Sequence, residues 1–176
     1  MLRAVIGAAT LAVGLLDGAA AQEPLKIGLI QSLTGSFSMV GKATVSGAQL
    51  YVQQHGDVVA GRKIELVVSD ATAPDWAKRI AQEMIVNDGV AIICAGITSS
   101  ALAIPPLVTE AKIATVVMVS GASITIERSP YMVRTSFTLG QSSAAMADWV
   151  VQRWVDVSSL SYGIDWRKLW SLAILP

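Results

Sequence analysis

Side chains that commonly carry out catalysis are few and scattered in this sequence. The chain has one histidine, His55, and one cysteine, Cys94, among 176 residues. Cys94 lies in the apolar run VAIIC, which is typical of a small buried side chain rather than of a reactive thiol. His55 has no second histidine with which to form a metal pair.

The acidic residues are also dispersed along the chain. Those that could serve in catalysis or metal binding are Glu65, Asp70, Asp75, Glu83, Glu110 and Glu127. Their spacing predicts neither an acid–base pair nor a metal cluster. The sequence therefore favours binding without catalysis, and it calls for no cofactor and no metal.

Two short loops rich in small and hydroxyl residues are better suited to binding. Their candidate site residues are Ser99 and Ser100 in the first loop, and Gly121, Ala122 and Ser123 in the second. Side by side at the end of a sheet, such loops could offer backbone N–H groups and hydroxyls to a carboxylate, at ~1.5–3 kcal/mol per charge-assisted hydrogen bond. A structural interpretation stays open, in which Thr98 and Ser99 only cap a helix and the second loop only turns the chain.

The loop before the first predicted helix has some features of a phosphate-binding loop. Such a loop needs four residues between its glycines and a serine or threonine directly after its lysine. Here five residues separate Gly35 from Gly41, and Ala43 follows Lys42. The backbone cradle is mis-spaced and the metal-binding hydroxyl is missing, which argues against a nucleotide site.

The elements that must position these loops alternate between strands and helices. Apolar runs predict strands over residues 26–30, 62–68, 90–94, 114–119 and 131–134. The clearest helical spacing is that of Ala77, Ile80, Ala81, Met84 and Ile85. Alternation of this kind, with Gly/Ser/Thr loops at the strand ends, predicts an α/β fold with a parallel, doubly wound sheet.

Local signals give further boundaries within this pattern. The first and last helices are predicted over residues 42–54 and 140–151. Thr72 is a predicted N-cap, and Gly89 is expected to end the same helix. Pro105-Pro106 should interrupt or restart the next helix. The strand over 90–94 is apolar at every position, which predicts cover on both of its faces.

The N-terminus has the pattern of an export signal. Arg3 precedes an apolar run over residues 4–16, and Ala19-Ala20-Ala21 offers small residues before Gln22. We interpret residues 1–21 as a signal peptide, since the run is shorter than the ~20 residues of a membrane span. The expected location is therefore periplasmic.

Charge and cysteine content exclude some partners and constraints. The chain has 13 basic and 13 acidic residues, so it has no electrostatic footprint for nucleic acid or anionic membrane. A single cysteine excludes an internal disulfide, although the exported compartment would permit one.

The end of the sequence departs from the α/β pattern. From Trp149 onward it holds four of the five tryptophans and offers no clean strand. We expect residues 22–150 to form the α/β domain and residues 151–176 to be an atypical tail. That tail is either a short C-terminal element or the result of truncation or frame-shift of a longer chain.

Several stretches, taken in order, resemble one known family. They are KIGLIQSLTGSFSMVGKATVSGAQL, GRKIELVVSD, AQEMIVNDGVAIICAGITSSA, the Ser-Gly-Ala-Ser loop and SPYMVRTS. Over residues 25–149 they resemble the periplasmic solute-binding proteins of branched-chain amino acid ABC transporters, the leucine/isoleucine/valine-binding protein family. The resemblance is specific to the family and not to one ligand.

The resemblance implies a two-lobed periplasmic-binding-protein fold of type I, of which residues 22–150 form the N-terminal ligand-binding lobe. It implies a non-enzymatic protein that binds an amino acid, an amide or another small carboxylate and delivers it to an ABC permease complex. The implied ligand-binding residues are Ser99, Ser100, Gly121, Ala122 and Ser123. Because the second lobe is not in this chain, the copy is expected to be incomplete. If a full protein bound at ~1 μM, losing half of the contacts would leave ~mM binding.

Two other functions stay open on the sequence alone. An extracytoplasmic ligand-sensing lobe of a regulatory receptor would look similar, and a downstream transmembrane or kinase segment would distinguish it. A small nucleotide-binding enzyme built on the loop before Lys42 is the other, and the export signal argues against it.

Overall fold

A computed structural model describes residues 22–153 of the chain. The predicted signal peptide, residues 1–21, lies outside the described residues, as does the predicted tail after residue 153. The strands are β1 (Leu25–Gln31), β2 (Val58–Val59), β3 (Arg62–Asp70), β4 (Ile92–Ala95), β5 (Ala114–Val117) and β6 (Met132–Arg134). The helices and helical turns are η1 (Gly35–Phe37), α2 (Ser38–His55), α3 (Pro74–Glu83), η2 (Met84–Asp88), α4 (Thr98–Ala103), α5 (Pro105–Glu110), η3 (Ser123–Arg128) and α6 (Leu139–Arg153).

The six strands form one sheet in the order β2-β3-β1-β4-β5-β6. All neighbouring strands pair in parallel except β2, which pairs antiparallel with β3. The chain passes from β1 to β3 on one side and then returns to β4 on the other, so the strand order reverses beside β1. Ligands of doubly wound sheets bind outside the carboxyl ends of the strands at such a reversal.

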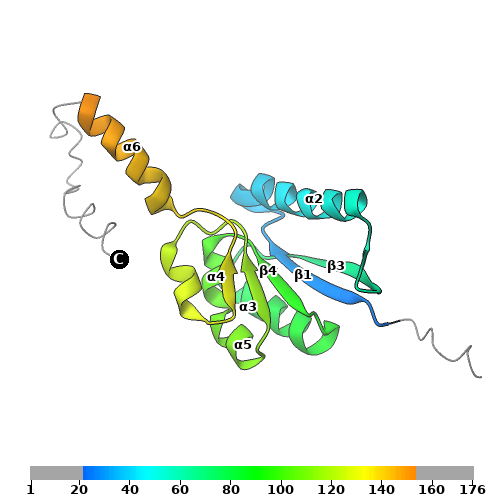
Figure 1. The fold of residues 1–176 in the computed structure, drawn as a ribbon. Helices are drawn as coiled ribbons and strands as arrows, with labels where there is room; N and C mark the ends of the chain where they lie inside the picture. The colour runs from blue at the N-terminus through cyan, green and yellow to red at the C-terminus, as the bar shows by residue number, and fades with distance from the viewer. Residues whose placement is uncertain (1–21, 154–176) are drawn as a thin grey trace, which may run out of the picture.

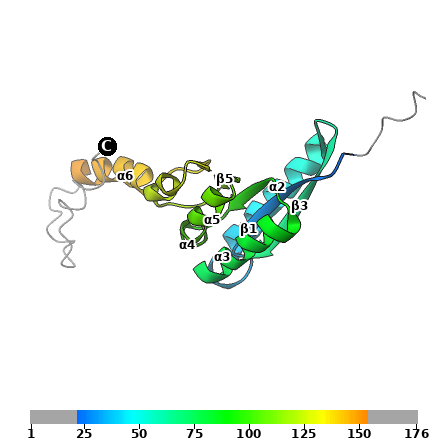
Figure 2. The ribbon, with the colours of Figure 1, turned by 90° about the horizontal axis from the view of Figure 1, so that it is seen from below.

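Helices lie on both faces of the sheet (Figure 1). Helix α2 covers one face, whereas α3, α4 and α5 lie on the other. Helix α6 extends outward beyond the β5–β6 side of the sheet in both views (Figures 1 and 2). This arrangement confirms the predicted α/β class and its parallel sheet.

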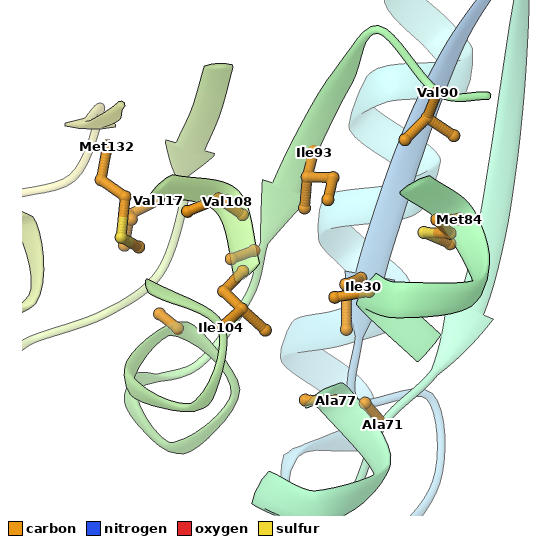
Figure 3. Close-up of a cluster of buried hydrophobic side chains, with 13 residues drawn as sticks. Ile30, Ala71, Ala77, Met84, Val90, Ile93, Ile104, Val108, Val117 and Met132 are labelled. Atoms are coloured by element: carbon orange, nitrogen blue, oxygen red, sulfur yellow. The ribbon is translucent and has the colours of Figure 1, made fainter. Parts of the chain in front are cut away.

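The main core lies between the sheet and α3, α4 and α5 (Figure 3). Its largest fully buried members from the strands are Ile30, Ile93 and Val117, and those from the helical side are Met84, Ile104 and Val108. Burying a side chain of this size contributes about 1.5–3 kcal/mol relative to leaving it exposed. This packing holds β1, β4 and β5 at a fixed register, and with them the loops that follow these strands.

The opposite face of the sheet is covered unevenly. Helix α2 packs against β1 and β3, where Leu29 is buried. Further along the sheet, Cys94 and Val116 are only half-buried, and Val133 is 57% exposed. The prediction that the strand over 90–94 is covered on both faces holds only in part for the described residues, because Ile93 is buried on one face whereas Ile92 and Cys94 are only partly buried on the other.

Several predicted boundaries were wrong in instructive ways. Helix α2 begins at Ser38 and not at residue 42, because the chain enters it directly from the turn η1. The N-cap of α3 is Ala73 without a side-chain hydrogen bond, so Thr72 does not cap that helix. The short strand β2 lies between the first predicted helix and the strand over 62–68, where no strand was predicted.

Other local predictions were confirmed. Gly89 adopts a left-handed conformation with φ of 64° and ends the helical segment. Pro105 stands in the first turn of α5, where the missing N–H costs no intrahelical bond, so the proline pair restarts the helix as predicted.

Candidate ligand-binding site

The two predicted hydroxyl loops lie side by side at the carboxyl edge of the sheet. Strands β4 and β5 are neighbours, with Ala95 paired to Val117 near their carboxyl ends. The loop after each strand therefore leaves the sheet at the same edge. The Oγ1 of Thr98 and the Oγ of Ser120 are 3.0 Å apart and join the two loops directly. The predicted neighbourhood of the two loops is confirmed, and we call the region between them the mouth.

The first loop leads into α4 without a side-chain cap. The N-cap is Ile97, which has extended backbone and makes no capping bond, so the interpretation that Thr98 or Ser99 caps the helix is wrong. The Thr98 hydroxyl turns toward the second loop instead. Within residues 22–153, the N–H groups of Ser99 and Ser100 have no described acceptor.

The two serines of the first loop differ in exposure. Ser99 is half-buried. Ser100 is only 2% exposed, and its Oγ is buried with no hydrogen-bond partner in the described part of the chain. The Ser100 side chain therefore lies inside the fold, which leaves its backbone N–H as the group it could offer to a ligand.

The second loop is held by the guanidinium of Arg134 at the end of β6. Its Nη1 donates to the carbonyl of Ser120, and its Nη2 donates to the carbonyls of Ala122 and Ser123, the last at 3.4 Å. The carbonyl and N–H of a trans peptide point in opposite directions. The N–H groups that follow these carbonyls therefore point away from Arg134.

The N–H groups that follow the carbonyls of Ser120 and Ala122 are those of Gly121 and Ser123. Among residues 22–153, no acceptor is described for the N–H of Gly121, Ala122 or Ser123. An unpaired backbone donor that is removed from water costs free energy, so a carboxylate that accepts from it is bound favourably. The positive charge of Arg134 behind the loop adds to the attraction for an anion.

Gly121 also permits a close approach by the start of α6. A Cβ at this position would lie 2.7 Å from the Cγ of Leu139, closer than such atoms come. The N–H of Leu139 donates to the Gly121 carbonyl at 2.9 Å. A side chain at position 121 would therefore require the exposed side chain of Leu139 to move.

The loop after β1 is fixed to the end of β3 by Asp70. The Asp70 carboxylate accepts hydrogen bonds from the Thr34 hydroxyl at 2.5 Å and from the Leu33 N–H at 2.7 Å. The Thr34 hydroxyl is the largest cause that lowers the pKa of Asp70. Burial opposes it, and the Leu33 N–H lowers the pKa further. The Ser32 hydroxyl donates to the carbonyl of Ala71 at 3.0 Å.

The glycine of the supposed phosphate loop has a packing role. Gly41 and Lys42 lie inside α2 and not in the loop before it. A Cβ on Gly41 would lie 2.0 Å from the carbonyl oxygen of Ser32, so the glycine lets the helix touch the backbone after β1. The geometry therefore offers no phosphate cradle here.

Other chemistry-bearing features do not form a second site at the mouth. Burial raises the pKa of the Cys94 thiol, which keeps it protonated and unreactive. No group of three or more metal-ligating side chains occurs within residues 22–153. A surface hollow of about 670 Å³ is lined by residues of α4 and α5 and by Arg128, and none of the predicted site residues lines it.

No helix within residues 22–153 is long and apolar enough to cross a membrane.

Comparison with known proteins decides the family. Residues 24–158 match the family described as periplasmic binding protein. The chain belongs to this family. Membership in a family of binding proteins confirms the expectation of binding without catalysis.

Three relatives illustrate how much of a whole protein the chain represents. It is 34% identical to the Leu/Ile/Val-binding protein homolog 6 of Brucella abortus, over 86% of this chain and 41% of the relative. It is 49% identical to a solute binding protein of an ABC transporter from Rhodopseudomonas palustris BisB5, solved in complex with 3,4-dihydroxybenzoic acid, with a TM-score of 0.72 over 76% of this chain and 37% of the other. It is 26% identical to a leucine binding protein from Thermotoga maritima, with a TM-score of 0.67 over 72% of this chain and 36% of the other. The chain thus spans about two fifths of the relatives that it matches.

Three residues that build the mouth were missed as site residues by sequence reasoning. They are Thr98, Ser120 and Arg134. Thr98 was considered only as a cap, and Ser120 only as part of a turn. The available signal was an arginine at the end of a predicted strand, where a charged side chain at a sheet edge requires carbonyl or carboxylate partners.

Proposed function

We propose that this chain supplies one wall of the ligand-binding site of a solute-binding protein that serves an ABC uptake system. The observation that carries the proposal is the hydroxyl contact of 3.0 Å between Thr98 and Ser120, which places two loops with unpaired N–H groups at one mouth. Such a mouth suits the carboxylate of a small molecule.

The preferred ligand is a small hydroxy-substituted aromatic carboxylate. The Rhodopseudomonas palustris relative at 49% identity was solved with 3,4-dihydroxybenzoic acid. A branched-chain amino acid is the second candidate, because the Brucella abortus relative at 34% identity is a Leu/Ile/Val-binding protein homolog. Both ligands combine a carboxylate with a second group that donates hydrogen bonds.

In this proposal each predicted site residue has a defined role. The N–H groups of Gly121, Ala122 and Ser123 donate to the carboxylate, and the Ser99 and Ser123 hydroxyls add side-chain hydrogen bonds. Ser100 contributes its backbone N–H, since its own hydroxyl is buried. No cofactor and no metal takes part.

The cellular setting follows from the same proposal. Residues 1–21 direct export, and residues 22–150 form the N-terminal lobe in the periplasm. The partner is a membrane permease complex that receives the ligand from a two-lobed protein. The Rhodopseudomonas palustris relative, which is described as a solute binding protein of an ABC transporter, favours this function over a sensory receptor lobe.

Titration of the whole chain with matched carboxylates and amides tests the proposal. We expect 3,4-dihydroxybenzoate and leucine to bind in the ~mM range, and the corresponding neutral amides to bind at least about tenfold more weakly, since the loops donate to an anion. Isothermal calorimetry at high protein concentration measures both.

A pair of serine variants locates the binding. Ser99→Ala should weaken carboxylate binding several-fold, whereas Ser143→Ala, an exposed position on α6, should leave it unchanged. Equal affinity for the carboxylate and its amide, or equal effects of the two variants, would contradict the proposal.

A further inference from the structure

Three hydroxyls form a continuous chain behind the mouth. The Thr98 Oγ1 lies 3.0 Å from the Ser120 Oγ, which lies 2.8 Å from the Thr125 Oγ1. The Thr125 Oγ1 in turn donates to the Ala122 carbonyl at 2.9 Å. Ser120 and Thr125 are each 0% exposed, so water does not compete for these bonds.

The carbonyl at the end of this series of hydroxyls fixes which hydroxyl donates to which. A carbonyl oxygen can only accept, so the single hydroxyl proton of Thr125 is committed to Ala122. Ser120 must therefore donate to Thr125, and its own single proton is then used. It follows that Thr98 must donate to Ser120.

Arg134 strengthens this direction. Its guanidinium also donates to the Ala122 carbonyl, the group at which the chain ends. Hydrogen bonds that run head to tail polarise one another, and a hydroxyl that donates becomes a better acceptor. Thr98 is at the other end of this series of hydroxyls and is only half-buried. Within residues 22–153 its Oγ1 makes no other described hydrogen bond.

We propose that Thr98 is a specificity-determining residue whose hydroxyl accepts a hydrogen bond from a donor group of the ligand, either a phenolic hydroxyl or an ammonium. The proposal rests on the proposed function for the existence of a ligand at the mouth, and it adds the requirement for a donor. It depends on the Thr98 hydroxyl, which already donates its proton to Ser120, and not on the backbone N–H groups of α4. A carboxylate oxygen is not a partner for Thr98, because that hydroxyl has no proton left to give.

The test compares ligands that differ only in the donor. The probes are 3,4-dihydroxybenzoate against benzoate, and leucine against 4-methylpentanoate, titrated into the whole chain by NMR at mM concentrations. Thr98→Val, which keeps the shape and removes the oxygen, should weaken the donor-bearing probe of each pair about tenfold and leave the other within about twofold. Thr98→Ser keeps the acceptor and should restore the preference.

A second variant keeps the test informative if Thr98→Val does not fold. Ser120→Ala leaves the Thr98 hydroxyl in place but removes its acceptor, so the Thr98 proton is free to point outward. The preference for donor-bearing probes should then fall at least about threefold through tighter binding of the donor-free carboxylates.

The possible results separate the two proposals. If none of the four probes binds the wild-type chain, the proposed function is wrong, and this inference fails with it. If the probes bind but Thr98→Val or Ser120→Ala affects both members of a pair equally, only the role of Thr98 is refuted.

Discussion

At the scale of single residues, the mouth is built from backbone groups that one side chain holds in place. Arg134 satisfies three carbonyls of one short loop, and its Nε is buried without a described partner among residues 22–153. The side chain thus acts on the ligand indirectly, by fixing which way the loop presents its N–H groups. We regard Arg134 as a positioning residue.

Replacing Arg134 tests this role. Arg134→Met removes the hydrogen bonds from the charged donor, worth about 1.5–3 kcal/mol each, and leaves only Ser136 on the Ser120 carbonyl and Thr125 on the Ala122 carbonyl. We expect lower stability in urea unfolding and carboxylate affinity reduced about tenfold or more. Arg134→Lys should recover part of both, because an ammonium can still donate to a carbonyl. Wild-type affinity for the carboxylate in a folded Arg134→Met variant would contradict the positioning role.

Asp70 predicts a dependence of stability on pH. Its pKa is lowered in the folded chain, chiefly by the Thr34 hydroxyl, so its ionised form stabilises the fold. This stabilisation is complete well above the ordinary value of 3.8 and is lost as the pH falls through the lowered pKa. Urea unfolding at pH 7 and at pH 3 should therefore show a smaller acid-induced loss for Asp70→Asn than for the wild type.

The control for this measurement is Glu65→Gln, which removes an exposed carboxylate from the same strand. It should retain the acid-induced loss of the wild type. An acid response of Asp70→Asn equal to that of Glu65→Gln would show that the bonds to Leu33 and Thr34 do not stabilise the fold.

At the scale of elements, α2 is positioned by one close contact with the backbone that follows β1. Gly41 provides this contact, and Gly47 lies further along the same helix with nothing near its missing Cβ. The two glycines share a helix and differ in surroundings. Substitutions at the two positions therefore distinguish the effect of packing on stability from that of helix propensity.

Alanine substitutions at these two positions should have opposite effects. Gly41→Ala forces α2 away from the Ser32 carbonyl, which we expect to destabilise the chain by at least about 1–3 kcal/mol. Gly47→Ala should stabilise it by about 0.5–1 kcal/mol, because alanine loses less backbone entropy in a helix. Chemical unfolding monitored by circular dichroism measures both, and equal effects would contradict the packing of α2 described here.

The sequence was sufficient to predict the alternation of the main strands and helices, whereas the adjacency of the two loops was a hypothesis that the strand order confirms. Continuous apolar runs such as 90–94 mark strands of a parallel sheet, and consecutive strands of that kind place their loops at one edge. The proline pair at 105–106 and Gly89 fix local conformation directly, so their effects were predictable. Side-chain partners were not, since the cap expected of Thr98 was replaced by a contact with Ser120, 22 residues away.

The missed features all depend on tertiary contacts. The position of the Ser100 hydroxyl inside the fold depends on how α4 packs. The role of Arg134 depends on β6 lying beside β5, where its guanidinium reaches the loop after β5. The local sequence shows an arginine at the end of a strand but not the carbonyls that it contacts.

At the scale of the whole molecule, the chain matches only part of its longer relatives. It spans 41% of its Brucella abortus relative and 37% of its Rhodopseudomonas palustris relative. Binding proteins that close around a ligand derive their affinity from both sides of the cleft. In the proposed function, the mouth is one side of such a cleft.

We therefore expect the chain to bind its ligand weakly. Half of the contacts of a ~1 μM site correspond to ~mM affinity. Calorimetry with 3,4-dihydroxybenzoate, leucine and valine should give weak heats at protein concentrations near 1 mM. Sub-micromolar binding by this chain would contradict the description of a single wall.

The measurement that tests the central claim most directly is an amide-resolved NMR titration of the chain with 3,4-dihydroxybenzoate. The account predicts that the N–H signals of Ser99, Gly121 and Ser123 shift together along one binding curve, while those of α5 stay fixed. Shifts confined to one of the two loops, or centred on the hollow beside Arg128, would contradict a site formed by the two loops together.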